Sequence, residues 1–303
     1  MYLRAITIGY AVPVDHFDAS VHSLFQSSIN LRLNKVNRLI TLFAASEGDL
    51  PQGIRLDAPA NFTFEKLQTG EPAVCRDGIL RFKNTSLTIQ LRGARRWKSD
   101  LPSLMVDASN PVVLPAWDLV WEALNKQQRL SKSEILAEDF FRLGEPESAS
   151  LSQNAGKAMR DLLRAARRYA LPNREAVRAL IGLGPGLTPS GDDLLVGYIA
   201  GLWSSVHDRN ERLQFISSLG KTIVRLSRMT NDISRTYLLH AVQGQVSSWL
   251  ANLVTAMSRG EPPEHLLEIA ETAMKVGHTS GMDAVTGMLV GLDAWRDKPL
   301  LAI

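Results

Sequence analysis

A Ser-Gly-x-Asp pattern that occurs twice constrains this chain more than any other feature of its sequence. The copies begin at Ser190 and Ser280, and each continues into glycines four residues apart, at 197 and 201 and at 287 and 291. Each copy is typical of a helix start, with serine as the N-cap and Asp193 or Asp283 three residues later in a capping box. The glycines put a smooth stripe on each helix. We therefore expect the two helices to pack together, or to place their N-termini around one cavity.

Paired helix N-termini suit a small anion, because they present unpaired N–H donors and partial positive charge. A loop rich in glycine and proline, residues 182–189, leads into the first helix. Close helix packing also explains the caps and the stripes, but packing does not require such a loop. The substrate-binding residues predicted at these N-termini are Gly184, Gly186, Thr188, Ser190, Gly191, Ser280, Gly281 and Asp283.

The loop does not match the known nucleotide-binding motifs. The third glycine of a dinucleotide fingerprint would fall on Leu187, and Asp192 and Asp193 stand where a phosphate loop needs Lys and Ser/Thr. The two carboxylates could hold a hydrated Mg²⁺ ion, or they could simply stabilise the helix N-terminus. Asp192 has no counterpart in the second copy, where Met282 stands. We expect Asp192 to be exposed and to contact a metal ion or a substrate amide.

Two further polar features lie near the copies. Residues 230–236 include Asn231 and Ser234, which are either helix caps or additional substrate ligands. His278 precedes Ser280 by two residues and is a structural histidine or a proton donor at that N-terminus. The predicted catalytic residues are Asp192, Asp193 and His278.

Composition excludes several classes of protein. The chain has 303 residues, 45% of them hydrophobic and 21% charged, with a net charge of +3, as in ordinary soluble proteins. Cys75 is the single cysteine, and the six histidines lack metal-ligand spacing, so we expect a reducing cytosol, no disulfide and no zinc site. No apolar run is long enough for a membrane span and no secretion signal is visible. Basic residues gather in 76–98 and on a stripe formed by Lys157, Arg160, Arg164 and Arg167. No nucleic-acid motif accompanies them, so a solvated face or a subunit contact is expected.

The sequence predicts an α+β chain of two domains. Residues 1–110 should form a β-rich antiparallel sheet or small barrel, with a hairpin joining 29–33 to 39–43, an Asp77-Gly78 hairpin, and strands around Phe62–Phe64 and 87–91. Residues 111–303 should be all-helical. Expected helices cover about 117–129, 131–142, 152–170, 174–181, 191–206, 211–228, 232–258, 263–276 and 281–296.

These motifs resemble a bacterial family that includes the AllH-like (H-type) subunit of oxamate carbamoyltransferase. The resemblance rests on Gly184–Asp193, on the Ser234 region and on Gly277–Asp283, together with Val21–Phe25. It implies a cytoplasmic role in purine or allantoin nitrogen catabolism. It also implies partner subunits resembling acyl-CoA synthetases, and transfer of the carbamoyl group of oxalurate to phosphate, giving oxamate and carbamoyl phosphate.

The residues are compatible with that role, because oxamate, oxalurate and phosphate are small anions that helix N-termini can bind. No covalent nucleophile is readable from the sequence. Two other hypotheses stay open. One is a non-catalytic scaffold that docks partner enzymes, and the other is a stand-alone Mg-dependent hydrolase or carboxylase.

Overall fold

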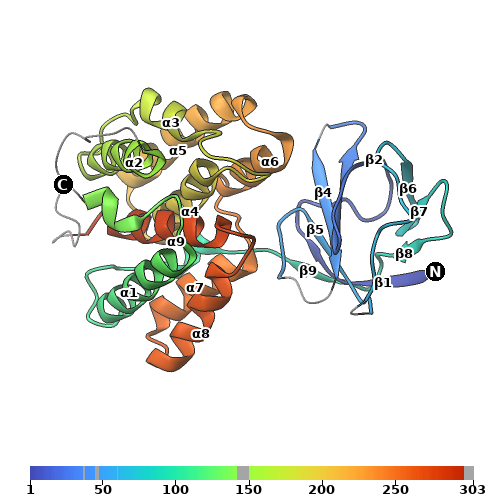
Figure 1. Cartoon of the computed structure of the whole chain (residues 1–303), viewed down its shortest axis with the longest axis horizontal. Helices are drawn as coiled ribbons and strands as arrows, with labels where there is room; N and C mark the ends of the chain where they lie inside the picture. The colour runs from blue at the N-terminus through green and yellow to red at the C-terminus, as the bar shows by residue number, and fades with distance from the viewer. Residues whose placement is uncertain (37, 45–47, 60, 142–149, 297–303) are drawn as a thin grey trace. The chain divides into compact units, whose positions relative to one another are not determined.

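The computed structural model describes residues 1–36, 38–44, 48–59, 61–141 and 150–296. The chain divides into two compact units, Met1–Ser99 and Asp100–Ile303. The first consists of strands and the second of helices (Figure 1), which confirms the predicted fold class.

Among the described residues of the first unit, eight strands close into a barrel. They follow the order β5-β4-β3-β2-β6-β7-β8-β1, and β1 closes the ring by pairing with β5. Apolar residues such as Ile29, Leu31 and Ile54 fill the interior and are completely buried. The strands are β1 Tyr2–Gly9, β2 Phe17–Leu24, β3 Ser28–Leu33, β4 Leu39–Ala44, β5 Gly53–Leu56, β6 Pro72–Arg76, β7 Ile79–Phe82 and β8 Thr88–Gln90, with β9 Arg95–Trp97 paired alongside β1.

Both predicted hairpins are confirmed. β3 and β4 pair antiparallel, and Asp77 and Gly78 turn between β6 and β7 with φ of 53° and 74°, the left-handed values of a type I′ turn. The barrel is mixed, since β1 runs parallel to β8 and β9, and β4 runs parallel to β5. Side chains alternate equally in parallel and antiparallel strands, so the sequence pattern does not reveal direction. The strand predicted around Phe62–Phe64 is wrong. These two rings stack edge-to-face in a loop, 4.8 Å apart, where they cover the barrel core.

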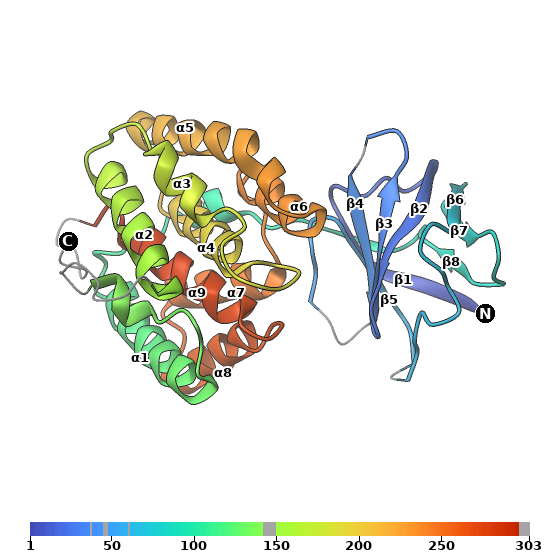
Figure 2. The ribbon, with the colours of Figure 1, turned by 45° about the horizontal axis from the view of Figure 1, so that its top comes forward.

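In the second unit, helices surround a central pair, α4 and α9 (Figures 1 and 2). Nearly every residue of both helices is buried, which is typical of helices enclosed on all sides. The helices are α1 Val113–Ser131, α2 Leu151–Arg167, α3 Arg174–Leu180, α4 Ser190–Ser204, α5 Asn210–Leu226, α6 Asp232–Ala241, α7 Ser248–Arg259, α8 Pro263–Met274 and α9 Ser280–Asp293, with 3-10 helices η1 Leu101–Leu104, η2 Ala137–Phe141 and η3 Ser227–Met229.

Two predicted helices differ from the structure. In the described residues, the helix expected over 131–142 is reduced to the short η2. The first expected residue, Ser131, instead ends α1, and Lys132 stops that helix in a left-handed conformation. The helix expected over 232–258 is divided into α6 and α7. Gly244, with φ of 73°, turns the chain between them, and the apolar periodicity on either side conceals this break.

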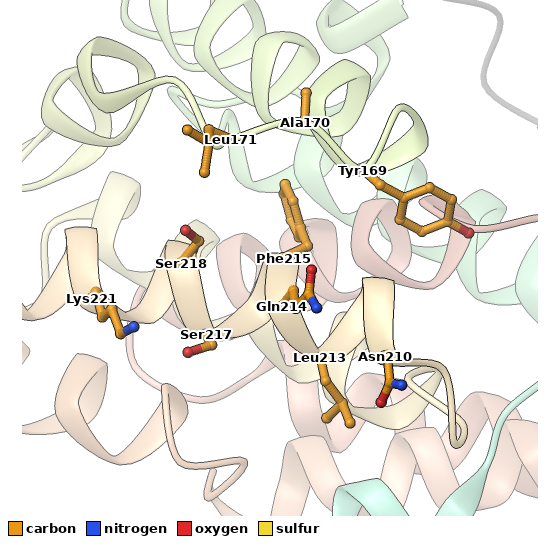
Figure 3. Close-up of a pocket in the computed structure, with 10 residues that line it drawn as sticks. All are labelled: Tyr169, Ala170, Leu171, Asn210, Leu213, Gln214, Phe215, Ser217, Ser218 and Lys221. Atoms are coloured by element: carbon orange, nitrogen blue, oxygen red, sulfur yellow. The ribbon is translucent and has the colours of Figure 1, made fainter.

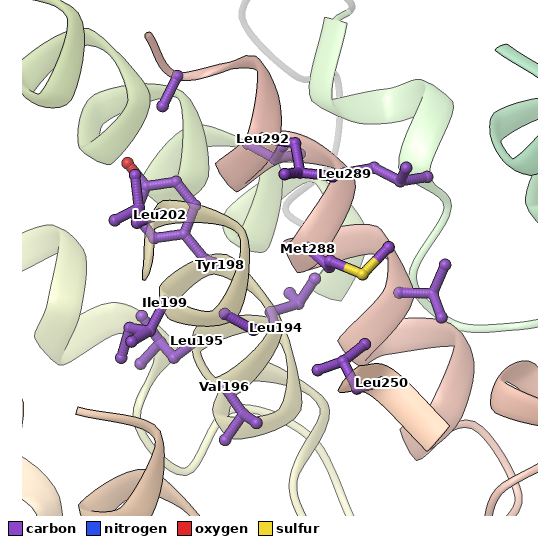
Figure 4. Packing of buried hydrophobic residues seen from close by; sticks show 14 of the residues in the cluster. Leu194, Leu195, Val196, Tyr198, Ile199, Leu202, Leu250, Met288, Leu289 and Leu292 are labelled. Carbon is purple, nitrogen blue, oxygen red and sulfur yellow. The ribbon is translucent and has the colours of Figure 1, made fainter. Parts of the chain in front are cut away.

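The core of this unit holds α4 and α9 in place. Leu194, Tyr198 and Met288 are completely buried in it (Figure 4). Two long polar groups reach across the core: the Tyr198 hydroxyl donates to the Leu162 carbonyl at 3.1 Å, and the Trp117 indole donates to the Leu289 carbonyl at 3.0 Å. These bonds satisfy buried donors and fix α1 and α2 against the central pair.

Candidate active site at the paired helix N-termini

The glycine stripes bring α4 and α9 into backbone contact. A Cβ added at Gly197 would lie 1.8 Å from the Ala284 carbonyl oxygen, and one at Gly287 would lie 2.0 Å from that of Leu194. These contacts are symmetric, because each glycine meets the carbonyl three residues before the other repeat's glycine. The helices therefore run parallel, with both N-termini at one end. There, Thr188 Oγ1 and Ser280 Oγ are 2.7 Å apart. The prediction that the repeat helices pack together is confirmed.

The predicted capping boxes are wrong. Ser190 and Ser280 are the first residues of their helices, and the preceding Pro189 and Thr279 make no side-chain cap bond. The polar partners are exchanged between the repeats instead: the hydroxyls of Ser280 and Thr188 act on Asp193, and those of Ser190 and Thr279 act on Asp283. The exchange is possible because the two parallel N-termini lie side by side.

Asp193 and Asp283 form a buried carboxyl pair. Burial raises the pKa of Asp283 to about 7, since water no longer solvates its charge, and the neighbouring hydroxyls offset only part of this effect. Burial also raises the pKa of Asp193 well above its usual range, and the charge of Asp283 raises it further. Two carboxylates this close cannot both ionise easily at neutral pH. The pair therefore retains a proton near pH 7.

Three of the four oxygens of this pair lack a hydrogen bond of ordinary geometry, although hydroxyls lie near them. Both carboxylate oxygens of Asp283 and the Oδ2 of Asp193 are sealed from solvent without a hydrogen bond of ordinary geometry in the described structure. Asp283 is 0% exposed and Asp193 is 8% exposed, so both side chains are buried. Buried polar atoms are nearly always paired in folded proteins, and exceptions are typical of catalytic groups or of sites for a water or an ion.

The glycine-rich loop divides into a part that packs and a part that is open. Gly184 and Gly186 both have φ of 100°, which favours glycine, and a Cβ at Gly186 would meet nothing within 4 Å. Gly191 and Gly281 instead press against the helices before them, where an added Cβ would lie 2.0 and 2.2 Å from carbonyl oxygens of Leu180 and Ala273. Their amides already donate to the carbonyls of Leu183 and Val276 at 2.9 Å. These two amides are therefore committed to the fold.

Asp192 is not exposed, contrary to the expectation from sequence, and its exposed fraction is 0%. Its Oδ1 accepts from the Gly182 amide at 3.0 Å, and its Oδ2 accepts from the hydroxyls of Thr230 at 2.6 Å and Ser234 at 2.7 Å. The side chain thus ties the glycine-rich loop and the start of α6 to α4. Burial raises its pKa, and the three donors oppose that rise. Asp192 acts as a positioning residue for the loop.

Replacing Asp192 with asparagine should lower the free energy of unfolding by about 1–3 kcal/mol. The amide nitrogen would take the place of an oxygen that accepts a charge-assisted bond in a buried site. Chemical denaturation of the purified chain measures the change. Asp118→Asn, at an exposed position of α1, is the matched control and should shift stability by less than about 0.5 kcal/mol. Equal stability of Asp192→Asn and the wild type would show that this side chain does not brace the loop.

The other predicted residues lie beside the pair or around it. Asn231 Oδ1 caps α6 by accepting from the amides of Ile233 and Ser234, and its Nδ2 donates to the Leu187 carbonyl at 2.8 Å. The Ser234 hydroxyl donates to Asp192, as described above. His278 is exposed on the loop before α9. The sequence prediction did not include Thr279, whose hydroxyl acts on Asp283. Its position directly before the repeated Ser280 could have indicated it.

The described residues contain no group of three or more His, Cys, Asp or Glu side chains that could hold a metal ion. Zinc sites usually have at least three protein ligands. A magnesium ion needs only one or two carboxylates. No helix in the described ranges is long and apolar enough to cross a membrane.

The basic stripe on α2 is largely engaged within the fold. Arg167 pairs with the fully buried Asp293 at 2.7 Å, Arg160 donates to the Asp139 and Phe140 carbonyls, and Arg164 pairs with Asp161.

A cavity of about 550 Å³ lies elsewhere, between residues 169–171 and α5 (Figure 3), and none of the predicted site residues lines it. The paired N-termini thus remain the candidate site.

Comparison with known families agrees with this picture of the chain. Residues 180–292, which include α4 and all of α9 except its last residue, match the family model described as oxamate carbamoyltransferase subunit AllH. Residues 5–96, which include most of the barrel, match the AllH family N-terminal domain. No solved structure matches the chain. Together the two family matches span most of the sequence, and the chain belongs to the AllH family of oxamate carbamoyltransferase subunits.

Proposed function

We propose that this chain is the substrate-binding subunit of an oxamate carbamoyltransferase-like enzyme, and that its substrate binds at the paired N-termini of α4 and α9. The reaction is carbamoyl transfer between oxalurate and phosphate in purine or allantoin nitrogen catabolism. The observation that carries the proposal is the carboxyl pair Asp193–Asp283, three of whose four oxygens are sealed and make no hydrogen bond of ordinary geometry in the described structure. Unpaired buried polar atoms are rare in folded proteins, and a catalytic role is one of the established reasons for them.

The chemistry of the site fits a small amide-bearing anion. Oxamate and oxalurate carry N–H groups that can donate hydrogen bonds to carboxylate oxygens. They also carry oxygens that can accept hydrogen bonds from hydroxyls. Asp193 offers a carboxyl group, and Thr188 and Ser280 offer hydroxyls beside it. The open Gly186 lets a ligand approach the backbone without meeting a side chain. A pair that holds one proton near neutral pH can also exchange it with the nitrogen of the scissile amide.

A covalent thiol intermediate on this chain does not fit the structure. Cys75, the single cysteine, lies in the barrel core, where burial raises its pKa to about 11. Its thiolate fraction at neutral pH is therefore very small. The family name describes a subunit, so the remaining chemistry belongs to partner subunits. The partners implied by the resemblance are proteins similar to acyl-CoA synthetases.

Reconstitution tests this function. Carbamoyl transfer should require this chain together with its partner subunits, and Asp193→Asn should lower the rate at least about 10-fold, within the range for a lost acid–base group. Asp232→Asn, the same change in the first turn of α6, is the matched control and should retain the wild-type rate. An unchanged rate with Asp193→Asn would favour a scaffold role. Turnover by the isolated chain with Mg²⁺ would favour a stand-alone hydrolase or carboxylase.

A further inference from the structure

A small polar cavity lies at the C-terminal ends of α4 and α9, opposite the carboxyl pair. Its volume is about 120 Å³, which is room for about four water molecules or for one ion the size of phosphate. The residues of its lining that carry the argument are Asp107, Ser109, His207, Arg209, Arg212 and Trp295. Because α4 is 15 residues long, the cavity lies about 20 Å from the carboxyl pair and is a separate site.

A buried arginine forms part of the wall of this cavity. Arg212 is 8% exposed, and its guanidinium carbon lies 5.0 Å from the centre of the Trp295 ring, which restricts the orientation of the planar group. The side chain donates to the carbonyls of Ser205 at 2.6 Å and Trp295 at 3.3 Å, while its Nε has no hydrogen-bond partner in the described structure. Carbonyl groups satisfy N–H donors but carry no full charge, and among the described residues no acidic side chain pairs with Arg212. A buried charge without a counterion costs free energy, which an anion in the cavity would reduce.

The rest of the lining adds positive charge and hydrogen-bond donors. Arg209 is exposed and is the N-cap residue of α5, and no side chain caps the first N–H groups of that helix. Uncapped N–H groups at a helix start favour an anion. Asp107 is the acidic residue of the described lining, and its Oδ1 accepts from the Ser109 amide at 2.8 Å. Two arginines and one aspartate leave the lining with an excess of about one positive charge.

Hydrogen bonds within the chain hold the wall opposite α5 in place. The Val106 amide donates to the Ser204 carbonyl at 2.7 Å. The Nε2 of His207 donates to the Val106 carbonyl at 3.2 Å, since a carbonyl group can only accept. The cavity is therefore formed before a ligand arrives, as in most small-molecule sites, and binding an ion requires little ordering of the backbone.

We propose that this cavity binds one small oxyanion, a free phosphate or a small carboxylate, with Arg212 as the buried ligand and Arg209 at the exposed rim. Guanidinium N–H groups match the oxygens of both kinds of anion. The lining comes from the segment that follows α4, from the end of α9 and from the start of α5, so a bound ion would connect the three helices. Because the ion would bind the folded chain alone, it should also stabilise the fold. The site goes beyond the proposed function and does not depend on it.

Titration calorimetry of the full chain with sodium phosphate and with sodium acetate, in a buffer free of both anions, tests the proposal. We expect one site, and the anion that binds more tightly identifies the class of ligand. Arg212→Lys keeps the charge but loses the planar fork, and it should weaken binding at least about tenfold. Arg209→Gln, at the rim, should weaken binding about two- to fivefold. Arg225→Gln is the matched control in the last turn of α5, and it should bind within about twofold of the wild type because it lies well beyond the screening length.

Thermal unfolding provides a second signal, because the preferred anion should raise the unfolding temperature of the wild type more than that of either cavity variant. Circular dichroism shows whether each variant is folded, and if Arg212→Lys is not, Arg209→Gln and its control decide the outcome. Three results would overturn the oxyanion site. They are no binding of either anion by the wild type, equal binding by the cavity variants and the wild type, and an equal loss in Arg225→Gln, which indicates general attraction to a basic surface.

Discussion

Replacing Asp283 with asparagine is expected to reduce carbamoyl transfer by the reconstituted enzyme about 100-fold or more, while leaving the chain at least as stable at pH 8. The loss of rate follows from removing one member of the pair that holds the proton. The stability follows from burial: Asp283 is 0% exposed and its two oxygens are unpartnered in the described structure, so its charge costs free energy that an uncharged amide does not.

The pH dependence of stability should identify this carboxyl group. Because its pKa is raised in the folded chain from 3.8 to about 7, its contribution to stability is complete below pH 3.8 and is lost as pH rises to about 7. Between pH 5 and pH 8 the wild type should lose about 3 kcal/mol of unfolding free energy through Asp283 alone. Asp193 faces Asp283 from α4, and because burial raises its pKa as well, it adds to the slope.

Denaturant unfolding at pH 5 and pH 8 measures this effect. Asp283→Asn should show a clearly shallower decrease than the wild type. An equally steep decrease in the variant would place the titration elsewhere, and a variant that is unstable at both pH values would make Asp283 a structural residue. Opposite effects on rate and stability are typical of a functional group that the fold tolerates at a cost.

Replacing Gly197 with alanine should destabilise the chain by about 3 kcal/mol or more. The new Cβ would lie 1.8 Å from the Ala284 carbonyl oxygen, and no side-chain rotation can relieve a contact with backbone. The helices must separate, which opens cavities in the core around Tyr198 and Met288 and moves Asp193 away from Asp283. Alanine's higher helix propensity returns only about 1 kcal/mol.

Gly220→Ala in α5 is the matched control. Its Cβ would meet Val242 at 3.4 Å, an ordinary contact, so this variant should be as stable as the wild type or up to about 1 kcal/mol more stable. Thermal unfolding of the two variants distinguishes packing from propensity. A Gly197→Ala chain that unfolds at the wild-type temperature would show that α4 and α9 do not need their backbone contact.

The sequence predicted correctly those features that local chemistry encodes. Asp77-Gly78 specifies a hairpin because both positions require positive φ, and the paired glycines of the repeats predicted the contact of α4 with α9. The repeat also directed attention to Asp193 and Asp283, because it placed one carboxylate at the same position of each helix. The parallel strand pairs of the barrel had no such signal, since alternation is independent of strand direction.

Only the tertiary structure decided what each polar group does. In sequence, Asp193 and Asp283 have the spacing of capping residues for their own helices, and Asp192 is the residue without a local role. In the fold, two parallel helices exchange partners, so each aspartate faces the other repeat's serine and loses its capping role. Asp192 meets three donors that lie 10, 38 and 42 positions away. Spacing along a chain determines which residues share a helix face, whereas hydrogen-bond partners and desolvation depend on segments that only folding brings together.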